Sequence, residues 1–202
     1  MSCTEIYTFD KNGDAHHYGN VRNAWRGAMA VWRIMEERYL PPYIPDYVRP
    51  CWWFHEGITQ EEMNKHLGYV PSRLSPLTPE ECKEEVWALV NNDAVPEKER
   101  IVLGTTFDKV LVKREHIPTV IEAFRSFCGD TTLPEQADLL EKIMQDPDVI
   151  AVGWNQTSVN ADNWTEYYFD GETMEYKPYN CLTGADHEWL LEDEVAENGD
   201  TL

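Results

Sequence analysis

The segment from residue 23 to residue 40 constrains the fold of this chain more than any other. It reads NAWRGAMAVWRIMEERYL, and its large apolar side chains recur every three or four residues, which is the spacing of one helical face. The members of this face are Trp25, Ala28, Met29, Trp32, Met35 and Tyr39. We therefore predict a central helix over residues 23–40, with Asn23 as its N-cap and with other elements packed over its apolar face.

The opposite face of this predicted helix is basic. Four arginines, Arg22, Arg26, Arg33 and Arg38, come from a chain that has only 17 basic residues. We expect them to face water or a partner, or to hold the acidic C-terminal third of the chain against the helix.

Strands and further helices are predicted on both sides of the central helix. A β-hairpin over residues 3–9 and 15–18 precedes it, and Asp170-Gly171 between two aromatic runs predicts a second hairpin over residues 164–177. The patterns between them predict helices over 78–90, 117–127 and 133–144, two β-runs within 101–113, and a buried strand over 149–154.

The predicted fold class is α+β. An N-terminal β-hairpin packs on a central amphipathic helix, and helices and a mainly antiparallel sheet follow, completed by the C-terminal hairpin. A polar, proline-bearing connection near residue 95 separates a hairpin plus helical region (1–95) from an α+β region (96–184), with an acidic tail (185–202). A single domain over 1–184 is the alternative.

The charge of the chain excludes several classes of partner. The net charge is −20, and residues 143–202 carry 14 acids against Lys177 alone, a net −13. A field of this sign repels nucleic acid and anionic membranes and attracts basic protein surfaces. Plain solubility is the simpler explanation of the same charge.

Tryptophan is more abundant than a core of this size requires. The chain has 8 tryptophans, and this residue type is enriched at interfaces, so we expect some of them to contact a partner. The candidate partner-binding residues are Trp52, Trp53, Trp164, Asp162, Glu166, Asp170, Glu172, Glu175, Glu192, Asp193 and Glu194. We expect them to bind a basic protein surface.

No motif of catalysis, metal binding or cofactor binding occurs in the sequence. It has no G-x-S-x-G, glycine-rich phosphate loop, C-x-x-C or H-E-x-x-H, and we predict no catalytic residue, metal or cofactor. Asp10, Asn12 and Asp14 have the spacing of a calcium loop, but Ala15 and Val21 stand where an EF-hand requires Gly and Glu. Two places remain for an unrecognised enzyme site. They are the polar stretch at 154–164 and the group Cys51, His55 and His66.

One short stretch resembles a known DNA-binding motif. Residues 58–68, ITQEEMNKHLG, are similar to the first helix and turn of lambda-repressor-type helix-turn-helix domains. Pro76 interrupts the segment where the recognition helix would lie, and the surrounding chain is acidic, so we favour a capped surface helix.

The cysteines and the N-terminus indicate the compartment. Five cysteines are widely spaced and odd in number, and neither a signal-peptide pattern nor an apolar run of membrane-spanning length occurs. We expect a cytoplasmic protein with free thiols that does not enter membranes.

Together these observations predict a non-enzymatic acidic interaction protein that binds and inhibits a basic, nucleic-acid-binding partner protein. Phage and mobile-element anti-defence factors include proteins of this character. The alternatives are an enzyme with its site around residues 154–164, and a structural subunit whose surplus aromatic residues lie in a homo-oligomer interface.

Overall fold

A five-stranded mixed sheet lies at the centre of the protein. The computed structural model describes residues 2–40, 79–107, 109–157, 164, 167–170, 174–183 and 187–191. The strand order is β2-β1-β4-β3-β7. The strands are β1 (Cys3–Asp10), β2 (Ala15–Arg22), β3 (Val110–Lys113), β4 (Val149–Gln156) and β7 (Glu188–Trp189). Their pairings are antiparallel, except that β7 runs parallel to β3.

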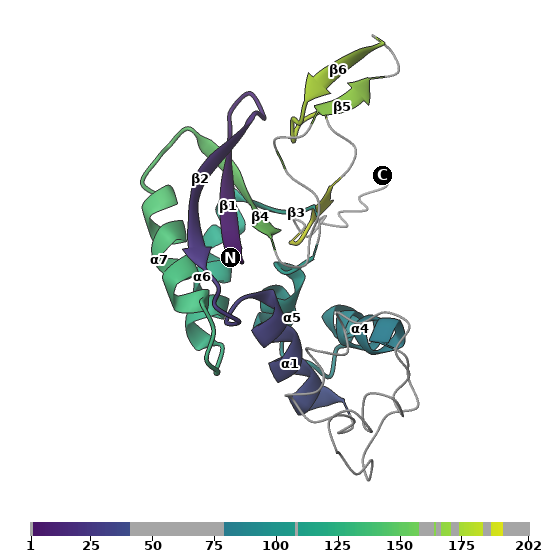
Figure 1. Cartoon of the computed structure of the whole chain (residues 1–202). Coiled ribbons are helices and arrows are strands. Elements are labelled where there is room, and N and C mark those ends of the chain that lie inside the picture. The colour runs from purple at the N-terminus through teal and green to yellow at the C-terminus, as the bar shows by residue number, and fades with distance from the viewer. Residues whose placement is uncertain are drawn as a thin grey trace, which may run out of the picture.

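Helices surround one face and one end of this sheet. They are α1 (Ala28–Tyr39), α4 (Pro79–Ala88), α5 (Glu97–Gly104), α6 (Ile117–Ser126) and α7 (Leu133–Ile143), with the short 3-10 helices η1 (Leu89–Asn91) and η2 (Arg114–His116). Figure 1 shows α6 and α7 against one face of the sheet and α1, α4 and α5 beyond its end. The α+β class is therefore confirmed. None of the described helices has the length and hydrophobicity that a bilayer-spanning segment needs.

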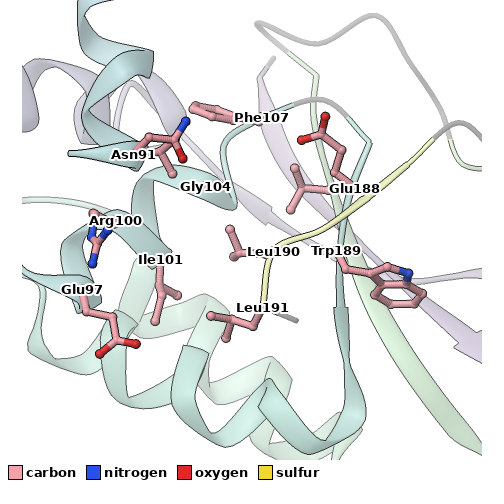
Figure 2. A pocket seen from close by; sticks show the side chains of 12 residues that line it. Asn91, Glu97, Arg100, Ile101, Gly104, Phe107, Glu188, Trp189, Leu190 and Leu191 are labelled. Carbon is pink, nitrogen blue, oxygen red and sulfur yellow. The ribbon is translucent and has the colours of Figure 1, made fainter. Parts of the chain in front are cut away.

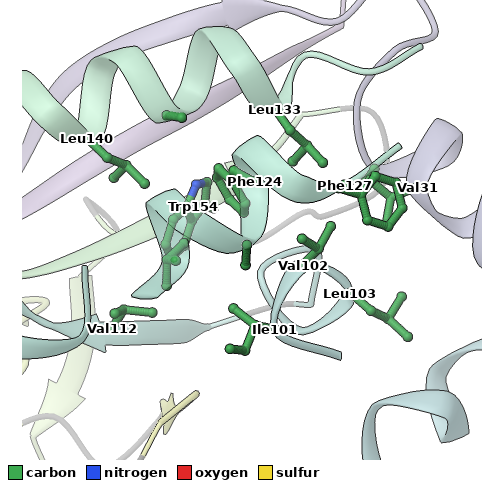
Figure 3. Close-up of a cluster of buried hydrophobic side chains, with 14 of the residues drawn as sticks. Val31, Ile101, Val102, Leu103, Val112, Phe124, Phe127, Leu133, Leu140 and Trp154 are labelled. Carbon is green, nitrogen blue, oxygen red and sulfur yellow. The ribbon is translucent and has the colours of Figure 1, made fainter. Parts of the chain in front are cut away.

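The main core lies between the sheet and the helices. Trp154 of β4 is 2% exposed and meets Phe124 of α6 with the ring centroids 6.1 Å apart (Figure 3). Ile6 of β1, Met35 of α1 and Leu103 of α5 belong to the same cluster and are fully buried. The core thus draws on both sides of residue 95, where the division into two regions stays a prediction.

A second, aromatic cluster covers the other face of the sheet. Successive side chains of a strand point to opposite faces, so Phe9 lies on the side away from α6 and α7. Its ring lies 5.5 Å from that of Trp164, which in turn lies 5.0 Å from that of Tyr179. Trp164 fits closely over Gly153, where a Cβ would lie 3.0 Å from its ring. Trp164 and Tyr179 are therefore packed onto the sheet.

The start of the central helix differs from the prediction. The helix α1 begins at Ala28, with Gly27 as an N-cap that makes no side-chain bond. Asn23 is 2% exposed and contacts Thr4, so its predicted capping role is wrong. The predicted burial of Trp25 is also wrong, because this residue precedes the helix and is 70% exposed. The spacing of apolar residues in a sequence does not show at which residue a helix begins.

The first of the two β-runs predicted over 101–113 is also wrong. Residues 97–104 form α5, in which Ile101, Val102 and Leu103 are all buried. A short, continuously apolar run fits a buried helix as well as a buried strand, and the acids in the first turn favour the helix. The second run is the strand β3, as predicted.

The helix expected over residues 58–68 lies outside the described residues, and the other predicted elements are present, with one difference in the sheet. The helices α6 and α7, the strand β4 and the N-terminal hairpin agree with the sequence patterns. The C-terminal hairpin is also confirmed, as β5 (Tyr167–Asp170) and β6 (Glu175–Pro178). Within the described residues these two strands form a sheet of their own, and β7 supplies the last strand of the main sheet.

Candidate functional site

Three of the predicted partner-binding residues lie in the described part of the chain. Trp164 is only 4% exposed, and its indole Nε1 donates a hydrogen bond of 3.1 Å to the carbonyl oxygen of Trp154. Its ring surface is therefore used inside the aromatic cluster. The other two are Asp170 and Glu175. The remaining candidates lie outside the described residues and stay predictions: Trp52, Trp53, Asp162, Glu166, Glu172, Glu192, Asp193 and Glu194.

The structure brings Asp170 and Glu175 together. Asp170 is the last residue of β5, Glu175 is the first of β6, and the two are direct partners in the antiparallel register. Figure 1 shows this hairpin projecting beyond the main sheet. Met174, next to Glu175, is 70% exposed and has a φ of 58°. The hairpin register therefore places two acidic residues at directly opposed backbone positions.

Positive charge in the described residues is largely paired inside the molecule. Arg38 lies 2.7 Å from a carboxylate oxygen of Glu99, and Lys98 lies 2.6 Å from one of Glu122. The basic residues with a carboxylate partner are Lys11, Arg26, Arg33, Arg38, Lys98, Arg100 and Arg125. Arg114 instead donates to the backbone carbonyls of residues 144, 146 and 149, which run from the end of α7 to the start of β4. Because these basic residues are paired, the acids in excess determine the electrostatic potential of the surface.

Within the described residues, Arg26, Arg33 and Arg38 form ion pairs with the middle of the chain and with α1 itself. Arg26 pairs with Asp130 and Glu135, at Nε–Oδ1 and Nη1–Oε1 distances of 2.6 and 3.4 Å. Arg38 pairs with Glu99, and Arg33 lies 3.9 Å from Glu37 on its own helix. The ion pairs of Arg26 and Arg38 therefore connect α1 and the residues just before it to the middle of the chain.

A cavity of about 420 Å³ lies between α5 and the segment 188–191 (Figure 2). Strand β7 holds this segment in place, because Leu190 N–H donates to the Leu111 carbonyl over 2.9 Å. Leu190 rests on Gly104, where a Cβ would lie 2.2 Å from its Cδ1 atom. Its walls combine apolar side chains with the polar side chains of Asn91, Glu97, Arg100 and Glu188. These polar side chains do not form a catalytic arrangement.

Sequence reasoning did not find this cavity. Its two walls are about ninety residues apart in the chain, and the parallel pairing of β7 with β3 brings them together. The signal available was the pair Leu190-Leu191 in an otherwise polar stretch. That pair does not say which element it covers.

The alternative enzyme site at residues 154–164 is partly accounted for by strand pairing. Gln156 Oε1 lies 2.6 Å from the Thr4 hydroxyl, and Thr157 Oγ1 accepts a hydrogen bond of 2.9 Å from the backbone N–H of Cys3. Asn155 Nδ2 donates to a carboxylate oxygen of Glu5 over 2.9 Å. These polar groups fix β4 to β1. Residues 158–163 lie outside the described part, as do Cys51, His55, His66 and the helix-turn-helix-like stretch.

The possible metal ligands near the N-terminal hairpin have other partners. His16 Nε2 lies 3.2 Å from Asp10 Oδ2, and His17 packs edge-on against Tyr7 with the ring centroids 5.4 Å apart. Burial by itself raises the pKa of Asp10. Hydrogen bonds from the N–H groups of Asn12 and Asp14 and from His16 outweigh it, so the pKa is lowered overall. The described residues contain no group of three His, Cys, Asp or Glu that could hold a metal ion.

The described thiols differ in reactivity. Cys181 is 4% exposed within the aromatic cluster, and burial raises its pKa to about 11. A thiol with so high a pKa is almost wholly protonated at neutral pH and is a poor nucleophile. Cys128 is exposed, and Cys3 is partly buried.

Comparison with known protein families, with characterised proteins and with solved structures finds no match to this chain. The function is therefore argued from the charges and contacts described above.

Proposed function

We propose that this protein is an acidic interaction protein that binds a basic, nucleic-acid-binding partner protein and inhibits it. The net charge of −20, of which −13 lies in residues 143–202, favours a cationic partner and disfavours direct contact with nucleic acid. A phage or mobile-element anti-defence role is one biological setting for such an inhibitor.

The register pairing of Asp170 with Glu175 carries this proposal. Solubility requires only that acids be present somewhere on the surface. It does not require two of them to be direct partners in the register of one hairpin. Glu172 lies between them in sequence, so three acids occur within six residues of this hairpin. Acids gathered in one hairpin concentrate negative charge, and a cationic surface of the partner would be attracted to them.

The internal pairing of the basic residues supports the same conclusion. Arg26, Arg38, Arg125 and Lys98 are each within 2.7 Å of a carboxylate oxygen. A basic partner therefore meets few competing cations on the described surface. An uncompensated field of one sign accelerates association with a partner of the opposite sign.

The test is capture from a lysate of the source organism, followed by measurement of the affinity for the captured protein at increasing salt. We expect a basic partner whose affinity falls steeply between low and high salt. The key variant is Asp170→Asn with Glu175→Gln. The matched control is Glu84→Gln with Glu115→Gln, which removes the same charge from two exposed acids elsewhere.

The two double variants separate the possible outcomes. If the hairpin binds the partner, the hairpin variant loses affinity and the control keeps it. Equal losses would mean that only total charge matters and would remove the hairpin from the proposal. Affinity that does not change with salt would overturn the electrostatic mechanism, and a stable self-oligomer that captures no protein would favour the assembly-subunit alternative.

A further inference from the structure

The cavity between α5 and the segment 188–191 has a carboxylate at each end. Glu97 lies in the first turn of α5, Glu188 is the first residue of β7, and both are exposed. Both line the cavity, whose volume is about 420 Å³. Figure 2 shows the two glutamates on opposite sides of Leu190. A ligand that spans the cavity would therefore meet a negative charge at either end.

The two carboxylates are not used for internal contacts in the described part of the chain. Among the described residues, neither the Glu97 nor the Glu188 side chain has a hydrogen-bonded or ion-paired partner. The backbone N–H of Glu188 donates to the Lys109 carbonyl over 3.0 Å, which fixes the position of this residue without engaging its carboxylate. Both groups are therefore available to a ligand.

The basic residue of the cavity wall is already paired. Arg100 is the only basic residue among the described residues that line the cavity, and its Nη1 atom lies 3.1 Å from Oδ1 of Asp93. Two lysines, Lys98 and Lys109, are close to the lining residues in sequence but do not line the cavity, and Lys98 pairs with Glu122 at 2.6 Å. The uncompensated charge of the walls is therefore that of the two glutamates, and it favours a cation.

Apolar side chains line the same cavity and select against a bare metal ion. They include Val90 of η1, Ile101 of α5, Val110 of β3 and Leu191. Methylene groups placed against such side chains are removed from water, which favours binding. A metal ion would instead require several ligands close together, and the described residues contain no group of three that could hold one. The cation that fits these walls is therefore an organic one with an apolar body.

We propose that this cavity binds a linear aliphatic diamine in its diammonium form. One ammonium group pairs with Glu97, the other pairs with Glu188, and the methylene chain between them lies on the apolar side chains. A monoamine can pair with only one of the two glutamates, and a diol with neither. The proposal is independent of the function proposed above, because it concerns a different part of the molecule.

The test is a titration of the isotope-labelled full-length protein at low salt, followed through the backbone amide signals in NMR spectra. These signals report both the affinity and the place of binding. The probes are the terminal diamines of butane, hexane and octane, each compared with the monoamine and the terminal diol of the same chain length. The variants are Glu97→Gln and Glu188→Gln. The matched controls are Glu84→Gln and Glu115→Gln, which remove the same charge from exposed acids elsewhere.

We expect at least one diamine to shift the amide signals of Ile101, Gly104 and Leu190. It should bind about 2- to 5-fold more tightly than the monoamine of the same length, which is the range for one exposed ion pair, and the diol should bind most weakly. Either Glu97→Gln or Glu188→Gln should reduce the affinity for the diamine to that for the monoamine. The two control variants should keep the full preference for the diamine.

Several results would overturn the proposal. One is that no diamine binds more tightly than its diol, and another is that the shifted signals lie outside the cavity. If the cavity variants lose no more affinity than the controls, the net charge of the chain explains the binding and the diamine site is refuted. A loss in only one of the two cavity variants would refute a ligand that spans both glutamates. None of these results bears on capture of a basic partner, so the proposed function would stand or fall by its own test.

Discussion

Replacing Gly27 by alanine tests how firmly the buried Asn23 holds the chain just before α1. A methyl carbon added to Gly27 would lie 2.3 Å from Cγ of Asn23 and within 2.5 Å of both terminal atoms of its amide. Asn23 cannot move aside cheaply, because it is buried and its Oδ1 contacts the Thr4 hydroxyl at 2.8 Å. The φ of Gly27 is −85°, so the cost comes from this contact and not from a left-handed backbone.

The magnitude follows from three terms. Overpacking a filled site costs about 1–3 kcal/mol, and separating a buried hydrogen-bonded pair costs about 1–3 kcal/mol. The reduced entropy of the unfolded chain returns about 0.4–1 kcal/mol. We therefore expect Gly27→Ala to lower the free energy of unfolding by about 2–4 kcal/mol, which in a chain of this size lowers Tm by about 5–15 °C.

The assay is thermal and urea unfolding followed by circular dichroism, with two comparisons. Gly19→Ala is the control, since nothing lies within 4 Å of a Cβ added there, and it should match the wild type or exceed it slightly. In a double-mutant cycle, Asn23→Ala should relieve the damage done by Gly27→Ala, with a coupling energy of about 1 kcal/mol or more. Additive effects, or a Gly27→Ala variant as stable as Gly19→Ala, would refute the reasoning.

Three further predictions concern thiols, tyrosines and the core. Cys128 should react with a thiol reagent at neutral pH far faster than Cys181, because burial raises the pKa of Cys181 to about 11. Mass spectrometry of the labelled peptides measures the two rates, and equal rates would contradict the prediction. Burial and the hydrogen bond to Glu99 raise the pKa of Tyr39 to about 12 from 10.0, so its contribution to stability should be full below pH 10 and lost as the pH rises towards 12. Tm measured across that interval should fall less in Tyr39→Phe. Leu140→Ala should cost about 2–5 kcal/mol in urea unfolding, because this side chain is fully buried between α7 and the sheet.

The sequence predicted those elements in which the apolar spacing and the residues at the ends of the element indicate the same structure. The helix α6 has a proline in its first turn and buried Val120 and Phe124 four residues apart, and the turn residues of the first hairpin stand between two β-prone runs. The strand prediction at residues 101–104 was wrong because a run that is buried on every side shows neither the helical nor the strand period of apolar residues. The pairing of β7 with β3 could not be foreseen, since two residues have no strand signal and depend on a neighbour distant in the chain.

The candidate site was predictable only in part. Asp170 and Glu175 were selected for their charge, and the turn signal between them implied that they would be close. Trp25 was assigned to the core because its spacing matches that of Trp32, which is 4% exposed. The difference arises from Asn23, whose burial against Thr4 requires a turn before the helix. The helical spacing of apolar residues does not indicate that Asn23 is buried or that a turn precedes the helix.

The placement of acids in the chain separates an interaction protein from one that is merely soluble. A protein selected only for solubility has no reason to make two acids direct partners in the register of one hairpin. Asp170→Asn with Glu175→Gln should therefore weaken capture of a basic partner more than Glu84→Gln with Glu115→Gln does, although the two double variants have the same net charge. Partner affinity, measured on both variants at the same salt concentration, tests this. Equal affinities would leave the hairpin without a function, and net charge alone would then explain the acidity.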